Sequence, residues 1–362
     1  MFKNNELKSK LQEIWSNTFI EKGLQGLLSV APRTGKTICA LKIASKIKAK
    51  KVLVCYPDNK IKNSWIGDVE KLKYKGNITY TTYLSLYKHI DKYDMVIFDE
   101  IHSTSEAQRE QMQNLLKINK VWIGLSGSLS KQTIIELNQY FKAKVIVEYT
   151  IEQAIKDGII ANYEIHVVTC KLDDVKKTPN SKGKMLTEKQ KCKNYSYVIE
   201  NLIRQGKSIF MLSIARTRLV QNSISRIAKA KELLKQFKNE KVLIFTGVTK
   251  TASILGEFVH HSKDENEEEF IAFAAGKSKF NHMAVCKIGQ SGVNFHNLEK
   301  IILVSFTGNE EDTAQKICRC LLLQEDPDKT SHIWLISTDE EFELKKLKKS
   351  LGMFKQSKIT YE

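Results

Sequence analysis

Two short segments of the sequence combine residue types that suit a phosphate-bearing ligand and a Mg²⁺ ion. The first is VAPRTGKT, Val30–Thr37, which lies between an apolar run and a helical pattern. A turn between a strand and a helix points backbone N–H groups at an anion, and the helix N-terminus favours negative charge. Lys36 is then placed to neutralise the β and γ phosphates, and Thr37 to offer its hydroxyl to Mg²⁺. The other loop residues predicted to surround the phosphates are Pro32, Arg33, Thr34 and Gly35.

This loop departs from the usual Gly-x-x-x-x-Gly-Lys-Ser/Thr pattern at its first position, where Val30 replaces the glycine. Gly35 is retained beside the lysine, where the backbone must approach a phosphate most closely. A chance Gly-Lys-Thr in an ordinary strand–helix turn is the alternative interpretation. The match of strand, helix and spacing favours a phosphate loop.

The second segment is DMVIFDEIH, Asp94–His102, in which an apolar run leads into Asp99 and Glu100. Adjacent carboxylates repel each other, but the pair is explained if Mg²⁺ lies between Asp99 and the phosphates. Glu100 then orients and deprotonates the attacking water. An exposed acidic loop is the alternative. His102 is predicted to couple this site to a second domain, with capping of the following helix as its alternative.

Both segments need elements that hold them at one edge of a sheet. Short apolar runs alternate with helical patterns through the first 150 residues or so, which predicts a parallel sheet with helices on both faces. The predicted strands are Leu24–Ala31, Val52–Tyr56, Asn77–Thr82, Met95–Phe98 and Val121–Leu125. The predicted helices are Ile38–Lys48, Lys60–Leu72, Leu84–His89 and Ser105–Lys117.

A second α/β pattern follows, after a short helix predicted at Tyr149–Ala161 and ended by Gly158. We therefore predict a first domain at 1–148, a connection at 149–162 and a second domain at 163–362. The predicted strands of the second domain are Glu164–Thr169, Val242–Phe245, Phe270–Ala274, Ala284–Lys287, Ile301–Val304 and Ile333–Ile336. Its long helices are predicted at Leu186–Ile203 and Ala215–Phe237, and a surface loop at Lys176–Lys184.

Composition indicates a cytoplasmic globular protein without membrane association. The chain has 362 residues, and no apolar run approaches the roughly 18 residues of a membrane span. The first ten residues are polar and lack the apolar core of a signal peptide. The seven cysteines are scattered, and the pair Cys318 and Cys320 lacks the second ligand pair of a structural zinc site. Reduced thiols are the favoured interpretation.

The charge is strongly positive and unevenly distributed. The formal net charge is +17, and residues 171–240 hold 17 Lys and Arg against 6 Asp and Glu. A basic surface of this kind attracts a phosphate backbone. A solvated, lysine-rich surface is the alternative, and composition alone does not decide between them.

The order of these motifs resembles that of superfamily 2 helicases and translocases. The phosphate loop, the strand ending in Asp-Glu-Ile-His and the later Leu125–Ser128 correspond to motifs I, II and III. The sequence looks DEAD/DEAH-like, nearest the Swi/Snf-like and phage-type DNA helicases, over nearly the whole chain. The resemblance implies two tandem RecA-like domains with ATP and Mg²⁺ in the cleft between them. It also implies an adenine-reading role for Gln12 and coupling roles for Ser126 and Ser128.

The second half resembles the later motifs of the same superfamily. Lys241–Gly247 is similar to motif IV and Gly289–Phe295 to motif V. Ala314–Leu323 stands in the place of motif VI, where Gln315 and Arg319 match the family form. The resemblance implies that both act at the γ-phosphate, with Arg319 as an arginine finger. The family residues are replaced at Lys316, Cys318 and Leu322, which leaves a plain amphipathic helix as the alternative.

The resemblance also implies contacts to a nucleic-acid backbone. Positions carried over from the matching motifs are Ser64 and Thr82 in the first domain and Thr246 and Ser291 in the second. The basic helix predicted at Arg216–Leu234 adds Arg216 and Arg226, with an ordinary solvated helix face as the alternative.

The resulting hypothesis is an ATP-dependent helicase or translocase that moves along or remodels nucleic acid, with DNA preferred as partner. One alternative is an RNA helicase. An alternative of another class is a scaffold or switch that binds ATP and nucleic acid with slow turnover, because motif VI is incomplete.

Overall fold

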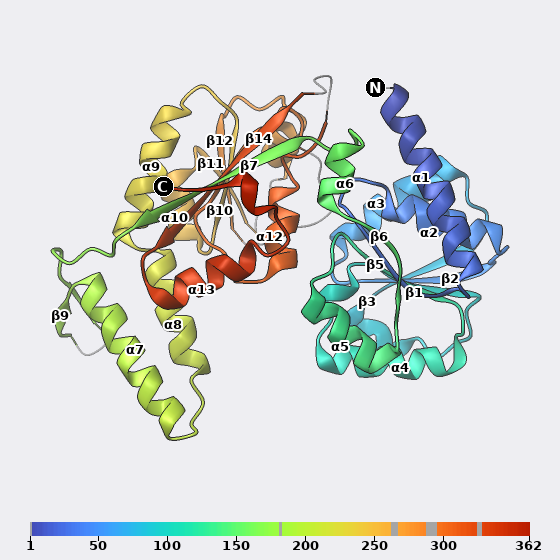
Figure 1. Ribbon diagram of the computed structural model, residues 1–362, viewed down its shortest axis with the longest axis horizontal. Coiled ribbons are helices and arrows are strands. Elements are labelled where there is room, and N and C mark those ends of the chain that lie inside the picture. Colours follow the sequence, from blue (N-terminus) through green and yellow to red (C-terminus); the bar gives the residue numbers. More distant parts are fainter. Residues whose placement is uncertain (1, 181–182, 262–266, 287–294, 324–327) are drawn as a thin grey trace. The chain divides into compact units, whose positions relative to one another are not determined.

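The structure is a computed structural model that describes the chain apart from residues 1, 181–182, 262–266, 287–294 and 324–327. The chain divides into two compact units, one formed mainly by the residues up to Ala161 and the other mainly by those from Asn162 onward. Each unit is built on a parallel sheet with helices packed around it (Figure 1). The predicted α/β architecture of two tandem domains is therefore confirmed.

The first unit holds a six-stranded parallel sheet with the order β3-β2-β4-β5-β1-β6. Its strands are β1 (Gln25–Val30), β2 (Lys51–Tyr56), β3 (Asn77–Thr82), β4 (Met95–Phe98), β5 (Trp122–Ser126) and β6 (Val145–Tyr149). Its helices are α1 (Phe2–Glu21), α2 (Lys36–Lys46), α3 (Lys60–Leu72), η1 (Tyr83–Lys88), η2 (Ile101–Ser103), α4 (Glu106–Ile118), α5 (Lys131–Phe141) and α6 (Ile151–Lys156). Because β1 and β4 lie in this sheet as parallel strands, the phosphate loop and the acidic pair follow the same edge.

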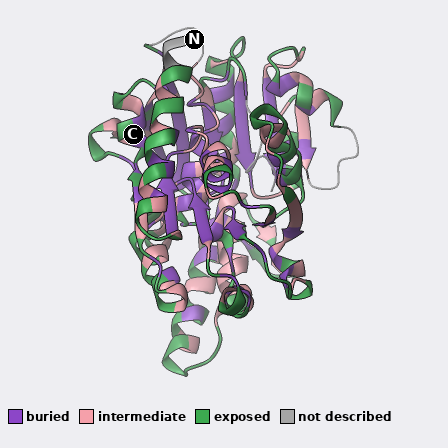
Figure 2. Ribbon diagram, turned by 90° about the vertical axis from the view of Figure 1, so that its right-hand side faces the viewer, coloured by how far each residue is buried: buried purple, intermediate pink, exposed green. Residues whose placement is uncertain are grey.

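The core of the first unit explains why its central strands read as continuous apolar runs. β2, β4 and β5 are buried on both faces, as Figure 2 shows for the strands generally. Phe98 and Trp122 meet edge to face at 6.2 Å between ring centroids, and Ile101 packs in the same cluster. The loop that follows β4 is thereby anchored in the core just beyond the acidic pair.

Four elements of the first unit were not predicted from the sequence: α1, α5, β6 and the three-residue η2. Helix α1 packs against α2, where Lys46 of α2 ion-pairs with Glu13 of α1. Trp15 of the same helix packs against Tyr149 at the end of β6, with the ring centroids 5.1 Å apart. These contacts fix α1 beside the phosphate loop, and with it Gln12.

The second unit holds a seven-stranded parallel sheet with the order β11-β12-β10-β13-β14-β7-β15. Its strands are β7 (Asn162–Cys170), β10 (Val242–Thr246), β11 (Phe258–His261), β12 (His282–Cys286), β13 (Lys300–Leu303), β14 (Thr330–Thr338) and β15 (Ile359–Tyr361). Its helices are α7 (Glu188–Arg204), α8 (Phe210–Gln221), α9 (Ile224–Gln236), α10 (Thr249–Leu255), α11 (Glu268–Ala274), α12 (Glu310–Ile317), α13 (Glu341–Ser350) and η3 (Gln356–Lys358). The short strands β8 (Thr178–Pro179) and β9 (Met185–Leu186) form a separate antiparallel pair.

Two predictions for the second unit are wrong. Phe270–Ala274 lies in helix α11 and not in a strand, because a short apolar run is compatible with either element and here packs as a helix face. The single helix predicted at Ala215–Phe237 is two helices, α8 and α9. Ser223 ends the continuity, because its side chain accepts a hydrogen bond from the backbone N–H of Arg226 and caps α9.

Among the described residues, no helix combines the length and the apolar character required to cross a membrane.

Candidate nucleotide site

The phosphate loop joins the end of β1 to the start of α2 through a backbone that only particular residues accept. Gly35, directly before the helix, has φ of +89°, in the left-handed region that favours glycine. A Cβ atom there would lie 2.2 Å from Nε2 of Gln12, so a side chain at this position would displace the glutamine. Arg33 also has a positive φ, of +69°. The turn is therefore built for a close approach of the backbone.

Gln12 supports this turn from the neighbouring helix. It is buried, and its side-chain amide donates a hydrogen bond of 2.9 Å to the carbonyl oxygen of Thr34. The hydroxyl of Thr34 donates to the carbonyl of Ala31 at 2.7 Å. These two bonds hold the loop in shape. The adenine-reading role of Gln12 stays a prediction, but its position against the loop is observed.

The acidic pair lies within reach of the lysine of the loop. Nζ of Lys36 donates to Oε1 of Glu100 at 2.9 Å, across 64 residues of sequence. Both side chains are only slightly exposed, at 14% and 17%. A contact between these two residues brings the motif I and motif II segments together at one end of the sheet. The ammonium group is therefore held where a phosphate can exchange for the carboxylate.

Asp99 is held more deeply than Glu100. Its Oδ2 accepts a hydrogen bond of 2.9 Å from the indole N–H of Trp65, and its carbonyl accepts one of 2.7 Å from the hydroxyl of Tyr83. Burial, assisted by the neighbouring charge of Glu100, raises the pKa of Asp99 to about 6 against the opposing effect of Lys36. A buried carboxylate that is costly to ionise is well suited to a divalent cation, which would offset that cost.

A polar chain continues from the acidic pair to the end of β5. Nδ1 of His102 lies 2.9 Å from Oγ of Ser126 and 3.5 Å from Oε2 of Glu100. The Ser126 hydroxyl donates to the carbonyl of Ser128 at 2.9 Å. Since that donation uses the hydroxyl hydrogen, His102 supplies the hydrogen of its own contact with Ser126. The three residues predicted to couple the site are thus brought into contact with each other.

The end of β5 also packs directly on the phosphate loop. A Cβ atom on Gly127 would lie 3.1 Å from Cγ of Pro32 and 3.3 Å from Nζ of Lys36. A larger residue at this position would press on the lysine.

The arrangement can hold a nucleoside triphosphate with Mg²⁺. The residues that would surround the phosphates are Pro32, Arg33, Thr34, Gly35, Lys36 and Thr37, and those that would face the ion are Thr37 and Asp99. Thr37 lies in the first turn of α2, partly exposed, at the helix terminus that favours an anion. The fit rests on the strained turn, the buried carboxylate and the lysine held between them.

Three residues of this site were missed by sequence reasoning. Trp65, Tyr83 and Gly127 stand far from the phosphate loop in sequence, and their roles come from side-chain contacts across the sheet. Nothing in the sequence indicates that the indole N–H of Trp65 reaches Asp99.

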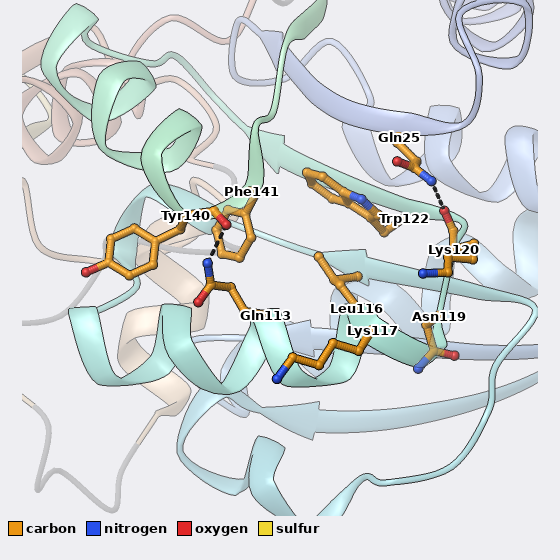
Figure 3. A pocket seen from close by; sticks show the side chains of 9 residues that line it. All are labelled: Gln25, Gln113, Leu116, Lys117, Asn119, Lys120, Trp122, Tyr140 and Phe141. Atoms are coloured by element: carbon orange, nitrogen blue, oxygen red, sulfur yellow. Dashed lines mark hydrogen bonds between the residues drawn. The ribbon is translucent and has the colours of Figure 1, made fainter.

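The described cavity of the first unit lies at the other edge of the sheet. Its volume is about 400 Å³, and Gln25 and Trp122, the first residues of β1 and β5, are part of its lining (Figure 3). The phosphate loop follows the opposite end of β1. This cavity is therefore separate from the nucleotide site.

The nucleic-acid contacts predicted in the first unit lie at accessible positions. Ser64 is exposed on α3, and Thr82 is partly exposed at the end of β3. Their role stays a prediction.

In the second unit the motif VI segment divides between helix α12 and the residues after it. Gln315 lies on α12 and Arg319 follows its end, and both are partly exposed. Lys316 is 8% exposed, and its Nζ lies 2.8 Å from Oδ2 of Asp312, one turn earlier. The lysine that replaces the first family arginine is thus paired within its own helix. The assignment of Arg319 as the finger remains a prediction.

The prediction that Arg226 binds a nucleic-acid backbone is wrong. Its side chain is fully buried, with one guanidinium nitrogen 2.6 Å from Oε1 of Glu343 and another donating to the carbonyl of Val304 at 2.9 Å. Such a residue presents no surface to a phosphate. The sequence of the helix shows a charge at position 226, but it does not show that its partner is Glu343 on α13.

The other predicted contacts of the second unit are also less open than expected. Arg216 lies 3.9 Å from the ring centroid of Phe342 and donates to Oγ of Ser196. Thr246 is 5% exposed, with its hydroxyl 3.3 Å from the carbonyl oxygen of Val248. Ser291 lies outside the described residues, as does most of Gly289–Phe295.

Comparison with known sequences places relatives along both halves of the chain. The family model described as the res subunit of type III restriction enzymes matches residues 4–150, which contain the phosphate loop and the acidic pair. A curated relative, the DNA 3′-5′ translocase XPB2 of Sulfurisphaera tokodaii, is 23% identical over 336 residues. That alignment covers 83% of this chain and 75% of the relative.

Solved structures share the fold at low sequence identity. One is a fragment assigned as the HsdR subunit of a type I restriction enzyme from Vibrio vulnificus, with a TM-score of 0.61 and 18% identity. That match covers 90% of this chain but only 63% of the fragment. Another is Dbp5 of S. cerevisiae bound to RNA and ADP BeF3, with a TM-score of 0.59 and 11% identity, covering 98% and 89%.

Proposed function

We propose that this chain is a member of superfamily 2 of the helicases and translocases, and that it hydrolyses ATP with Mg²⁺ to translocate along DNA. The observation that carries the proposal is the contact between Lys36 and Glu100, which joins the phosphate loop to the acidic pair. The order of the motifs and the family match over residues 4–150 support it.

The residues of the first unit take separate roles in the proposed reaction. The backbone of the loop and Lys36 bind the β and γ phosphates. Asp99 and Thr37 hold Mg²⁺, which when bound neutralises charge on the phosphates. Glu100, released from Lys36, orients the attacking water and accepts its proton. Glu100 has φ of +50°, in the left-handed region that a residue other than glycine seldom adopts.

The second unit supplies the remaining parts of the proposal. Arg319 stabilises the charge that develops on the γ-phosphate, and Gln315 assists it. These residues act when the two domains close on the nucleotide, and opening after hydrolysis moves the grip on the nucleic acid. The gripping contacts go to phosphates and are insensitive to sequence. Ser64 and Thr82 remain the proposed contacts of the first unit.

We favour DNA over RNA because the sequence relative that aligns along most of the chain is named as a DNA translocase. The RNA-bound Dbp5 shares only the fold at 11% identity, which keeps an RNA helicase as the second candidate.

The experiment that tests the proposal is the rate of ATP hydrolysis in the presence of single-stranded DNA, duplex DNA, single-stranded RNA or no nucleic acid. We expect DNA to raise the rate several-fold above the basal rate. Stimulation by RNA alone would establish the RNA helicase instead. A slow rate that no nucleic acid changes would reject a motor and support an ATP-binding scaffold.

A further inference from the structure

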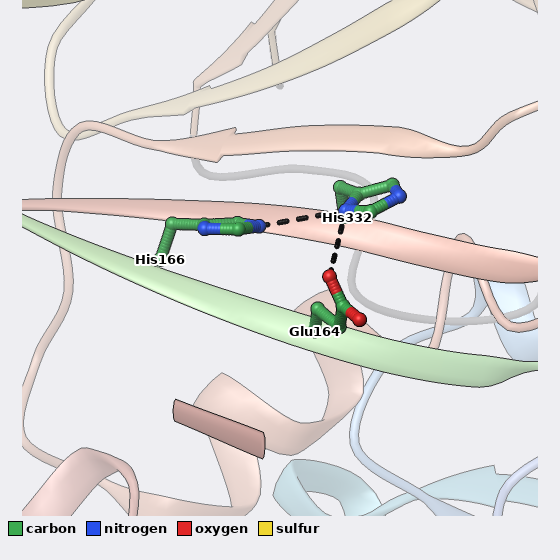
Figure 4. Close-up of side chains that lie close together, drawn as sticks. All are labelled: Glu164, His166 and His332. Atoms are coloured by element: carbon green, nitrogen blue, oxygen red, sulfur yellow. Dashed lines mark hydrogen bonds and ion pairs between the residues drawn. The ribbon is translucent and has the colours of Figure 1, made fainter. Parts of the chain in front are cut away.

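A cluster of two histidines and a glutamate lies on one face of the second sheet, outside the motif segments. Glu164 of β7 is the register partner of His332 on the adjacent strand β14, and His166 is the partner of Trp334. Since side chains two residues apart on a strand share a face, Glu164 and His166 lie on the same side. Figure 4 shows the side chains of His166 and Glu164 both turned toward His332.

Two distances within the cluster match those between the ligands of one tetrahedral metal ion. Nε2 of His166 lies 3.4 Å from Nδ1 of His332, and Nδ1 of His332 lies 3.4 Å from Oε2 of Glu164. The three ligand atoms all lie within 4.8 Å of one another. Bonds of about 2.0–2.1 Å to a tetrahedral Zn²⁺ place neighbouring ligand atoms roughly 3.3–3.5 Å apart. Two of the three distances in the cluster already have this spacing, and the third lies within 4.8 Å.

A carboxylate outside the cluster orients one of the histidines. Oε1 of Glu362 lies 3.4 Å from Nδ1 of His166, the ring nitrogen that points away from the cluster. A carboxylate in this place accepts a hydrogen bond from the Nδ1–H group, so Nε2 carries the lone pair that can bind a metal. Trp334 stacks on the same imidazole, with 5.0 Å between the centroids and 15° between the ring planes. His166 is therefore held in both tautomer and orientation.

Hydrogen bonds alone do not account for this arrangement. With the Nδ1 hydrogen of His166 directed at Glu362, its Nε2 presents a lone pair to Nδ1 of His332. Oε2 of Glu164 presents lone pairs to that same Nδ1 atom. His332 has a single hydrogen to offer there, and both contacts are at 3.4 Å, longer than a typical N–H···O bond. A cation at the centre would use the lone pairs of all three groups at once.

The cluster is accessible to an ion from solvent. Helix α9 covers this face of the sheet further along the strands, where Val168 and Ala230 pack in one core cluster and Phe237 contacts Trp334. Toward the start of β7 the cover ends, and the side chains of Glu164 and His332 are 53% and 35% exposed.

We propose that Glu164, His166 and His332 bind one Zn²⁺ ion, with water as the fourth ligand. Two imidazole nitrogens and one carboxylate oxygen are donors that Zn²⁺ accepts readily, whereas Mg²⁺ and Ca²⁺ require oxygen ligands. The ion joins β7 to β14, and through Glu362 it also fixes the chain that follows β15. Its role is to stabilise the second unit, and the inference does not depend on the proposed motor activity.

The test uses full-length protein without an affinity tag, stripped of metal by a chelator and titrated calorimetrically with Zn²⁺. We expect one ion per chain and a rise in the melting temperature on binding. Glu362→Gln should weaken binding by about 10–100-fold, as expected for a residue that orients a ligand. Glu164→Gln and His332→Ala should weaken it at least as much. Mg²⁺ at the same concentration should produce no rise.

His296→Ala is the matched control, because His296 is exposed and lies outside the cluster. It should bind Zn²⁺ as the unaltered chain does. Replacing Zn²⁺ by Co²⁺ gives a second readout, since a thiolate charge-transfer band would place the ion on cysteines and overturn the proposal. The proposal also fails if the chain takes up no Zn²⁺, or if Glu164→Gln and His332→Ala bind it unchanged.

Discussion

The two units treat their predicted site residues differently. In the first, Lys36 contacts Glu100 and His102 contacts Ser126 across long stretches of sequence, and Glu100 lies beside His102. In the second, Lys316 pairs with Asp312 inside its own helix and Arg226 is buried against Glu343. In the first unit, the ammonium group of Lys36 is paired with a carboxylate that a phosphate of a bound ligand can replace.

This difference shows that a residue at a motif position need not keep the role of the motif when the residues around it have changed. A charge in the second unit can satisfy the helical pattern of a motif and still be used for packing. Lys316, which stands at an arginine position of the motif, falls in this class, whereas Arg319 is partly exposed. The contrast predicts that substitutions in the first unit act on turnover and that most charge substitutions in the second act on stability.

The strongest test of the first half of this comparison is Lys36→Ala. We expect it to abolish measurable ATP hydrolysis, because the lysine binds the phosphates and positions Glu100. Steady-state phosphate release with saturating DNA is the measurement. Lys42→Ala, on the same helix and 3.6 Å from a carboxylate oxygen of Glu13, is the control and should retain turnover. Turnover retained by Lys36→Ala would remove the phosphate loop from the mechanism.

The comparison is sharpest at motif VI, where Arg319 and Lys316 lie three residues apart. We expect Arg319→Ala to slow DNA-stimulated hydrolysis by about 10³-fold, the scale of an arginine finger. Lys316→Ala should cost less than about tenfold, since its ammonium group is engaged with Asp312. Single-turnover rates measure both. If Lys316→Ala proves the more damaging, the lysine is the phosphate contact and the finger assignment is wrong.

The buried arginine tests the second half of the comparison through stability. Arg226→Met removes one partner of a buried ion pair and leaves Glu343 uncompensated, which should lower the free energy of unfolding by about 3–5 kcal/mol. Lys229→Met on the same helix breaks an exposed pair with Glu232 and should cost about 0–1 kcal/mol. Urea unfolding measures both.

The affinity of Arg226→Met for DNA, measured by fluorescence anisotropy below its unfolding temperature, should equal that of the unaltered chain. A fall in affinity with the fold intact would restore Arg226 as a backbone contact.

These cases also define what the sequence can predict. Val30–Thr37 and Asp94–His102 were predictable because their chemistry is local and continuous in the chain, and the alternation of strands and helices placed them at one edge. The contact of Trp65 with Asp99 and the burial of Arg226 depend on residues brought together by folding. The break before α9 depends on one cap, Ser223, inside an otherwise continuous helical pattern.

A pH titration examines the cost of burying Asp99. Its pKa of about 6 means that Mg²⁺ competes with a proton below that pH. We expect the apparent affinity for Mg²⁺ to fall about tenfold per pH unit below 6 and to level off above it. An Asp99→Asn chain should bind Mg²⁺ weakly at every pH. A level profile down to pH 5 would show that Asp99 does not hold the ion.

Without Mg²⁺, a rise in pH through the pKa of Asp99 lowers the stability of the folded state, whereas the same rise strengthens the binding of Mg²⁺. Because the folded pKa lies above the usual 3.8, the protonated carboxyl stabilises the folded state. That contribution is complete below pH 3.8 and is lost as the pH rises through about 6. The difference in unfolding free energy between the unaltered chain and Asp99→Asn should follow this curve.

The smallest effect expected concerns the chain of contacts from His102 to Ser126. If this pair couples hydrolysis to nucleic acid, Ser126→Ala should leave basal turnover nearly unchanged and lower the stimulation by DNA a few-fold. That magnitude matches a single hydrogen bond of about 0.5–1.5 kcal/mol. His102→Ala should lose stimulation to a similar degree. The ratio of stimulated to basal rates is the measurement.

The double variant decides whether the two residues act through each other. When two side chains act through one contact, the second substitution adds little to the first, so the cycle shows an interaction free energy near the value of either single change. If the two losses simply add, His102 and Ser126 work independently of each other, and helix capping does not account for His102, since the following helix α4 is capped by Ser105 and not by His102. The distance of 2.9 Å between Nδ1 and Oγ is the reason to expect the former. A coupled pair would also widen the difference between the units. The first unit would then contain both the residues that hydrolyse ATP and the first residues that couple hydrolysis to nucleic acid.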